Sequence, residues 1–189
     1  MHASSLLDAL AHPNADGVRS LGIGCDQKRG QRRMTKRRAA APAIVWFRQD
    51  LRLADNPALS AAIASGRPLI ALYVQDDANP GEWRLGRASR WWLHHSLTML
   101  ATGLGKLGLP LVLRRGDAGR VLPAVAAEAG AELVVWNRCY EPFAIERDAN
   151  LKKALQATGI AAESFNATLL HEPWAVKSQN GGPLRVFTP

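Results

Sequence analysis

Short runs of apolar residues, each bounded by turn-forming residues, recur along the chain from Pro42 onward. Apolar runs of this length without polar alternation are typical of strands that are buried on both faces of a sheet. Pro110 lies near the start of the third run, which indicates the beginning of a strand or an edge position. The pattern predicts strands at residues 43–47, 69–74, 109–113 and 133–136, and a short fifth strand at residues 162–165.

Between these runs, apolar residues recur every three or four positions, as they do on one face of a helix. The first such segment has Asp55 or Asn56 as its N-cap and Pro57 at the first helical position. The longest carries a stripe of leucines on one face, at Leu93, Leu97, Leu100, Leu104 and Leu107. The predicted helices span residues 58–64, 88–107, 118–129 and 145–158.

Strands that alternate with helices of this length indicate right-handed βαβ units and a parallel sheet. The five predicted strands are too few for a closed barrel of the kind that parallel strands form. We therefore expect an α/β fold with an open, doubly wound parallel sheet and helices on both of its faces.

Charge divides the chain into two parts. The net charge is +8, but residues 1–41 carry eight Lys or Arg against three Asp, whereas residues 42–189 carry 16 basic and 13 acidic side chains. We interpret residues 1–41 as a disordered basic extension. It could serve as a nucleic-acid arm or a targeting peptide. The interpretation that we favour is that translation starts at Met34.

The rest of the composition is that of an ordinary cytoplasmic protein. No apolar run approaches the roughly 18 residues that a membrane span needs. Cys25 and Cys139 form neither a metal-binding spacing nor a disulfide framework, which is typical of a reducing compartment. We expect a cytoplasmic monomer without a metal site.

Charged residues gather after the first, second and fourth predicted strands, in residues 48–55, 75–82 and 137–146. Ligands of open α/β sheets bind at the carboxyl ends of the strands, so these loops form the candidate site. The sequence lacks the glycine motifs of dinucleotide and triphosphate sites and the G-x-S-x-G motif of hydrolases. The residues alone therefore indicate a flavodoxin-like or nucleotide-binding-like domain with a polar pocket.

A purely structural role also fits part of this set. In that interpretation four charged residues pair with one another and cap the first helix: Arg48, Asp50, Arg52 and Asp55. Trp46 and Trp136 lie within predicted strands and are expected to be core residues.

Several segments, in order along the chain, resemble the DNA photolyase and cryptochrome family. Residues 43–59, AIVWFRQDLRLADNPAL, are similar to its opening strand and loop, whose signature is W-F-R-x-D-L-R-x-x-D-N. Residues 86–97 (GRASRWWLHHSL) resemble the start of its long second helix, and residues 133–148 (LVVWNRCYEPFAIERD) its fourth strand and the following loop. Residues 164–176 and 186–189 resemble the run into a second domain. Stress proteins and electron-transfer flavoproteins of similar topology do not share the W-F-R-x-D-L-R loop.

The resemblance implies a Rossmann-like sheet of strand order 3-2-1-4-5 in residues 42–172, followed in residues 173–189 by the start of a linker. In the whole protein the linker leads to a helical FAD-binding domain, which is absent here and which binds UV-damaged DNA. Such a deoxyribodipyrimidine photolyase uses light to split pyrimidine dimers flipped from the duplex. The same domain of a cryptochrome blue-light receptor is the alternative. The chain alone is expected to be inactive and to contain no catalytic residue.

By the same resemblance, the α/β domain holds an antenna chromophore that passes excitation energy to FAD. The deazaflavin-type pocket uses Arg48, Tyr73, Val74, Gln75, Asp76, Glu141 and Arg147. Cys139 occupies a position that is acidic in that pattern, and Phe143 and Ala144 stand where one folate pattern has an Asn-Glu pair. Other folate-binding branches place the ring differently. The antenna is therefore expected to be either methenyltetrahydrofolate or 8-hydroxy-5-deazaflavin.

Overall fold

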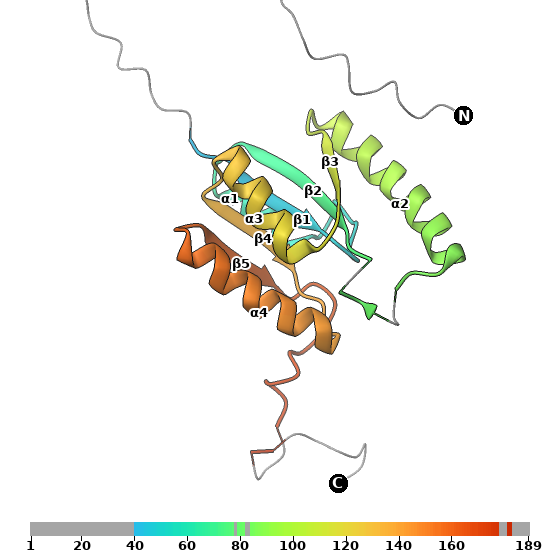
Figure 1. Ribbon diagram of the computed structural model, residues 1–189, viewed down its shortest axis with the longest axis vertical. Coiled ribbons are helices and arrows are strands. Elements are labelled where there is room, and N and C mark those ends of the chain that lie inside the picture. Colours follow the sequence, from blue (N-terminus) through green and yellow to red (C-terminus); the bar gives the residue numbers. More distant parts are fainter. Residues whose placement is uncertain (1–39, 78, 82–83, 178–180, 183–189) are drawn as a thin grey trace, which may run out of the picture. The chain divides into compact units, whose positions relative to one another are not determined.

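The computed structural model describes residues 40–77, 79–81, 84–177 and 181–182 (Figure 1). Met34 and nearly all of the predicted basic extension lie outside the described residues, as does most of the predicted linker at residues 173–189. Among the described residues, no helix combines the length and the apolar character that crossing a membrane requires.

Five parallel strands form one sheet in the order β3-β2-β1-β4-β5. The central strand is β1, in which Val45 pairs with Ala71 on one side and with Val135 on the other. The open α/β fold and the strand order are therefore confirmed. The strands are β1 (Ala43–Phe47), β2 (Leu69–Gln75), β3 (Leu111–Arg115), β4 (Leu133–Asn137) and β5 (Ala161–Phe165).

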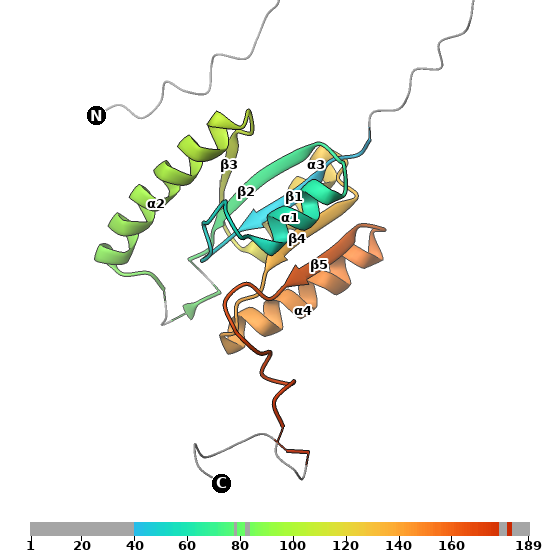
Figure 2. The same cartoon turned by 180° about the vertical axis from the view of Figure 1, so that it is seen from behind.

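Two helices cover each face of the sheet, as the two opposite views show (Figures 1 and 2). On one face the side chains of Val45 and Phe47 pack with α1 and α2, and on the other those of Ile44 and Trp46 pack with α3 and α4. Trp136 has no exposed surface and Trp46 only 3%, so both are core residues as predicted. The helices are α1 (Pro57–Ala64), α2 (Arg87–Lys106), α3 (Ala118–Ala129) and α4 (Pro142–Ala157).

Several boundaries differ from the predicted ones, and three of these differences have clear local reasons. β3 begins after Pro110, because the N–H of Leu109 still bonds the carbonyl of Leu104 at 3.0 Å and so completes the end of α2. The strand does lie at an edge, as Pro110 indicated. α4 begins earlier than predicted, with Glu141 as N-cap and Pro142 as its first residue.

The third difference concerns Leu107, which was wrongly included in the apolar stripe of the long helix. It follows the last residue of α2 and is 71% exposed. Leu100 and Leu104 are buried in the core, and Leu93 and Leu97 pack against it.

Candidate functional site

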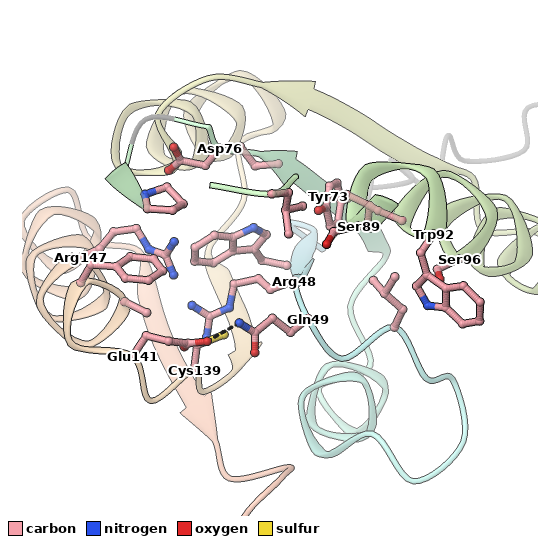
Figure 3. A pocket seen from close by; sticks show the side chains of 18 of the residues that line it. Arg48, Gln49, Tyr73, Asp76, Ser89, Trp92, Ser96, Cys139, Glu141 and Arg147 are labelled. Atoms are coloured by element: carbon pink, nitrogen blue, oxygen red, sulfur yellow. Dashed lines mark hydrogen bonds between the residues drawn. The ribbon is translucent and has the colours of Figure 1, made fainter. Parts of the chain in front are cut away.

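A large cavity lies at the carboxyl ends of β1 and β2, between the loop that follows β4 and the first half of α2 (Figure 3). Its volume is about 1230 Å³. The walls come from all of the loops in which the sequence predicted a site. They also come from α2, which was predicted as a helix but not as part of the site.

Six of the seven residues that the family resemblance implied line this cavity: Arg48, Tyr73, Val74, Asp76, Glu141 and Arg147. Gln75 is not among the lining residues. Its carbonyl accepts a hydrogen bond from the N–H of Gly116 at 3.0 Å, and its side chain hydrogen-bonds with Asp77. Gln75 therefore supports the loop that carries Asp76.

A buried ionic cluster forms one side of the site. Nη1 of Arg48 donates to both carboxylate oxygens of Asp148 at 2.9 Å, and Nε and Nη2 of Arg147 donate to Oδ1 of the same group at 3.2 and 3.1 Å. The carboxylate also accepts from the indole Nε1 of Trp136 at 3.0 Å. Only 8% of the Arg48 side chain and 12% of the Asp148 side chain are exposed. One carboxylate thus orients two guanidinium groups.

The structural role that the sequence allowed for the first loop is correct only in part. Asp50 pairs with Arg52 at 2.9 Å, and Asp55 lies 3.8 Å from Arg52. Arg48 does not join them but pairs with Asp148, 100 positions along the chain. The cap of α1 is Asn56, whose side chain accepts from the N–H of Leu59 at 3.0 Å.

Asn137 fixes the first loop to the end of β4. Its side-chain NH₂ donates to Asp50 and to Asn56, each at 3.0 Å, and its side-chain oxygen accepts from the N–H of Ala58 at 3.1 Å. The backbone carbonyl of Asn137 also accepts a hydrogen bond from Arg48. The position of Arg48 in the cavity wall is therefore set by several independent contacts.

Three buried polar atoms of the cavity walls have no hydrogen-bond partner among the described residues: Nε1 of Trp46, Nε of Arg48 and Oε2 of Glu141. The other oxygen of Glu141 accepts from Nε2 of Gln49 at 2.5 Å (Figure 3). Buried polar groups in folded proteins are nearly always hydrogen-bonded, so unpaired ones call for an explanation. The three residues line the cavity, but these atoms themselves are covered by neighbouring protein atoms.

The wall contributed by α2 was not predicted. Trp91 and Trp92 line the cavity although they are 63% and 69% exposed, and Ser89 and Ser96 lie with them (Figure 3). In the sequence, the signal for this wall was a pair of adjacent tryptophans that lie outside the leucine stripe of the same helix. Sites for organic ligands usually have mostly apolar walls and a small number of polar groups.

A carboxylate holds the start of α2 near the sheet. Asp77 accepts from Arg90 of α2 at 2.8 Å and from Arg115 of β3 at 3.3 Å. Its neighbour Asp76 accepts from the backbone N–H of Asn79 and of Ala118, each at 3.0 Å. The loop after β2 is thereby tied to three elements.

Burial acts on three titratable groups of the cavity. Burial raises the pKa of the Cys139 thiol and also the pKa of the Tyr73 hydroxyl. Burial lowers the pKa of Arg48, but Asp148 opposes this and the guanidinium stays charged. No group of three His, Cys, Asp or Glu within the described ranges could hold a metal ion. The arrangement suits binding of an aromatic molecule better than acid–base chemistry.

The loop after β4 is fixed on its outer side as well. Arg138 donates to Oγ of Ser164 at 3.0 Å and to Glu172, and the hydroxyl of Tyr140 donates to the second oxygen of Glu172 at 3.0 Å. This loop also carries Cys139 and Glu141. The segment that follows β5 therefore contacts the loop that also forms part of the cavity wall.

Comparisons with known proteins agree with one another. A family model described as DNA photolyase matches residues 43–189. A deoxyribodipyrimidine photo-lyase of Agrobacterium fabrum is 49% identical over 79% of this chain, and Cryptochrome-1 of Arabidopsis thaliana is 45% identical over 77% of it. The crystal structure of a bacterial class III photolyase from Agrobacterium tumefaciens matches 82% of this chain with a TM-score of 0.75 and 46% identity.

The chain spans less than a third of the length of these relatives. The matched part covers 30% of the photo-lyase, 21% of the cryptochrome and 32% of the protein in the crystal structure.

Proposed function

This chain belongs to the DNA photolyase family, and from that premise we propose that its α/β domain binds an antenna chromophore for a light-driven deoxyribodipyrimidine photo-lyase. Such a chromophore absorbs light and passes the excitation energy to FAD, which the remainder of the protein would hold. UV-damaged DNA would be bound through that remainder as well. We further propose that the protein is a cytoplasmic monomer.

The observation that carries the proposal is the set of three buried, unpaired polar atoms around one cavity among the described residues. Methenyltetrahydrofolate and 8-hydroxy-5-deazaflavin both have a fused ring with at least one carbonyl oxygen and one N–H along one edge. Once these side chains turn toward the cavity on binding, Nε1 of Trp46 and Nε of Arg48 could donate to a carbonyl, and Oε2 of Glu141 could accept from an N–H. A buried partner for each atom would remove an energetic penalty of about 1–3 kcal/mol per group.

The remaining walls suit the flat body of such a ring. Trp91 and Trp92 offer aromatic surface on one side, and Phe143 and Arg147 lie on another. We propose that Arg48, Tyr73, Val74, Asp76, Glu141 and Arg147 contact the pigment, whereas Gln75 acts through the loop that it supports. Transfer of excitation energy requires a fixed pigment and no acid or base, which is consistent with the neutral Cys139 and Tyr73.

The test is a fluorescence titration of the purified chain with each of the two pigments separately. We expect saturable binding of one of them and at least tenfold weaker binding by Glu141→Gln, which replaces the charged acceptor by an amide. Arg120→Gln is the matched control, because Arg120 is 91% exposed on α3 and should leave the affinity unchanged. If the unaltered chain binds neither pigment, the proposal is wrong.

A cryptochrome is the second candidate, and the 45% identity with Cryptochrome-1 of Arabidopsis thaliana favours it. The α/β domain would then serve a blue-light receptor rather than a repair enzyme. Irradiating a full-length protein that contains this domain with dimer-containing DNA distinguishes the two. Loss of the dimers indicates a photolyase, and a light response of the flavin without loss of dimers indicates a cryptochrome.

A further inference from the structure

The indole of Trp46 forms part of the cavity wall and has two positively charged neighbours. The guanidinium carbon of Arg48 lies over its ring, 4.6 Å from the centroid, and that of Arg147 lies 5.0 Å from the centroid. Both guanidinium groups are drawn in the close-up of the cavity (Figure 3). Trp46 is only 3% exposed, so water screens these charges weakly.

An indole beside an excited pigment can quench the excited state and so compete with energy transfer. Tryptophan is the most easily oxidised of the aromatic side chains, and an excited ring is a stronger oxidant than the same ring in its ground state. Quenching moves one electron from the indole to the excited ring and then returns it, so that no net reaction occurs. The excitation is lost as heat.

The two guanidinium groups oppose the first of these electron movements. Removal of an electron leaves a positive charge on the indole, and charges of the same sign a few ångströms apart repel strongly in a protein interior. Neither Arg can lose its proton to relieve the repulsion. Asp148 pairs with both, so the cluster of the two guanidinium groups and this carboxylate keeps an excess of one positive charge.

The other carboxylates of the cavity hydrogen-bond to neutral groups and not to the indole of Trp46. Glu141 accepts from Gln49, and Asp76 accepts from the backbone N–H of Ala118. Asp148 itself accepts from Nε1 of Trp136 rather than of Trp46. The charged groups that lie over the ring of Trp46 are therefore the two guanidinium groups.

No protein group among the described residues is placed to assist the oxidation of Trp46 by accepting its proton. An oxidised indole becomes strongly acidic at Nε1 and is stabilised when a base accepts that proton. Nε1 of Trp46 has no acceptor among the described residues, whereas Nε1 of the neighbouring Trp136 donates to a carboxylate. Of these two indoles, the one in the cavity wall is thus the less favourably placed to give up an electron with its proton.

We infer that Arg48 and Arg147 suppress quenching of the bound pigment by Trp46, because they make this indole difficult to oxidise; the inference concerns Trp46 and not Trp91 or Trp92 of the helix wall. The two arginines act on the pigment through Trp46 and are positioning residues in this respect. The inference rests on the proposed antenna function, since it concerns what happens to light energy after the pigment is bound.

The main experiment measures the excited-state lifetime of 8-hydroxy-5-deazaflavin, and separately of methenyltetrahydrofolate, bound to the 189-residue chain at saturation. Arg147→Gln should shorten the lifetime of the bound pigment at least twofold, and Arg147→Lys should keep it near the value of the unaltered chain. The double variant Trp46→Phe with Arg147→Gln should restore the longer lifetime, because Phe is a much poorer electron donor. A purely structural role of Arg147 would not be rescued in this way.

Two outcomes would overturn the inference: an unchanged lifetime in Arg147→Gln, or a shortened lifetime that Trp46→Phe does not restore. Arg120→Gln, on the exposed side of α3, serves as the control for nonspecific changes.

A second measurement needs no bound antenna. Riboflavin in solution is excited with blue light in air, so that excited riboflavin removes an electron from tryptophan and dioxygen then adds to the indole radical. Peptide mass spectrometry reports the oxidation of Trp46 alone. We expect at least twofold faster oxidation of Trp46 in Arg147→Gln than in Arg147→Lys or the unaltered chain, and equal rates would overturn the inference. If neither antenna binds, the proposed function fails, while this measurement still decides the protection of Trp46.

Discussion

At the scale of single residues, Asp148 has the largest influence on the site. Its carboxylate is the common partner of Arg48 and Arg147 and also holds the indole of Trp136. Sequence reasoning placed Arg48 and Arg147 in the site but gave Asp148 no role. Contacts between positions 48 and 148 depend on which strands become neighbours, and an acidic residue within a helix gives no indication of that.

Replacing Asp148 by Asn should destabilise the protein, because two largely buried guanidinium groups would lose their shared counter-charge. Removal of one partner from a buried ion pair typically costs about 3–5 kcal/mol, and we expect a loss near the lower figure in the free energy of unfolding. Urea unfolding at neutral pH measures it. Asp55→Asn is the control, since Asp55 is 94% exposed and Asn tolerates its positive φ of 52°. An unchanged midpoint for Asp148→Asn would show that the ionic cluster adds no stability.

Cys139 should react slowly with alkylating agents. Burial raises its pKa, so at any given pH below that value a smaller fraction is thiolate, the reactive form, than in a free cysteine. The rate of alkylation by iodoacetamide, followed by mass spectrometry of the peptide with Cys139, should therefore rise at higher pH than that of N-acetylcysteine. Saturating pigment should slow it at least tenfold, because Cys139 lines the cavity. A pH profile equal to that of N-acetylcysteine would contradict the burial of the thiol.

At the scale of elements, the apolar runs predicted the strands well because β1, β2 and β4 are buried on both faces. The predicted boundaries that proved wrong depend on local hydrogen bonds. The contact of Leu109 with Leu104 makes β3 begin later than predicted, and the cap at Glu141 makes α4 begin earlier. The helix wall of the cavity was missed for another reason. Periodicity identified the face of α2 that packs on the sheet, but whether Trp91 and Trp92 face solvent or a cavity depends on the neighbouring loops.

Asp77 should stabilise the start of α2 at neutral pH, where its carboxylate is ionised, and not in acid, where the carboxylate is protonated. Hydrogen bonds from Arg90 lower its pKa, while burial opposes them. The stabilisation is therefore complete above the pKa of an unfolded Asp, about 4, and is lost as the pH falls through the lower pKa of the folded state. Asp77→Asn should cost at most about 1 kcal/mol at neutral pH, because its partners are partly exposed, and progressively less as the pH falls.

Denaturant unfolding across this pH range measures the effect, and hydrogen exchange should show faster opening in the first turn of α2. Glu128→Gln is a suitable control, because Glu128 is exposed on α3 and makes no ion pair within the described part of the chain. A cost for Asp77→Asn that is equal at pH 7 and pH 2 would exclude the ion pair as its cause.

At the scale of the whole molecule, the chain corresponds to 30% of its photo-lyase relative from Agrobacterium fabrum. Both hydrophobic clusters of the sheet and the walls of the cavity are built from described residues of this domain. The fold, the strand order and the family could all be predicted from the sequence. The identity of the antenna could not, because it depends on the shape and hydrogen bonding of a cavity built from distant loops.

The chain by itself should not repair DNA. We expect that irradiation of the purified 189-residue chain with dimer-containing DNA and added FAD leaves the dimers intact, and that FAD is not retained on gel filtration. A full-length relative under the same light is the positive control. Loss of dimers with the chain alone would refute the assignment of this domain to light harvesting only.

The contacts of Glu172 with Arg138 and Tyr140 have a mechanical consequence. A displacement of the chain at Glu172 would be passed through these contacts to the loop that holds Cys139 and Glu141. Tension at this point would therefore shift two residues of the cavity wall.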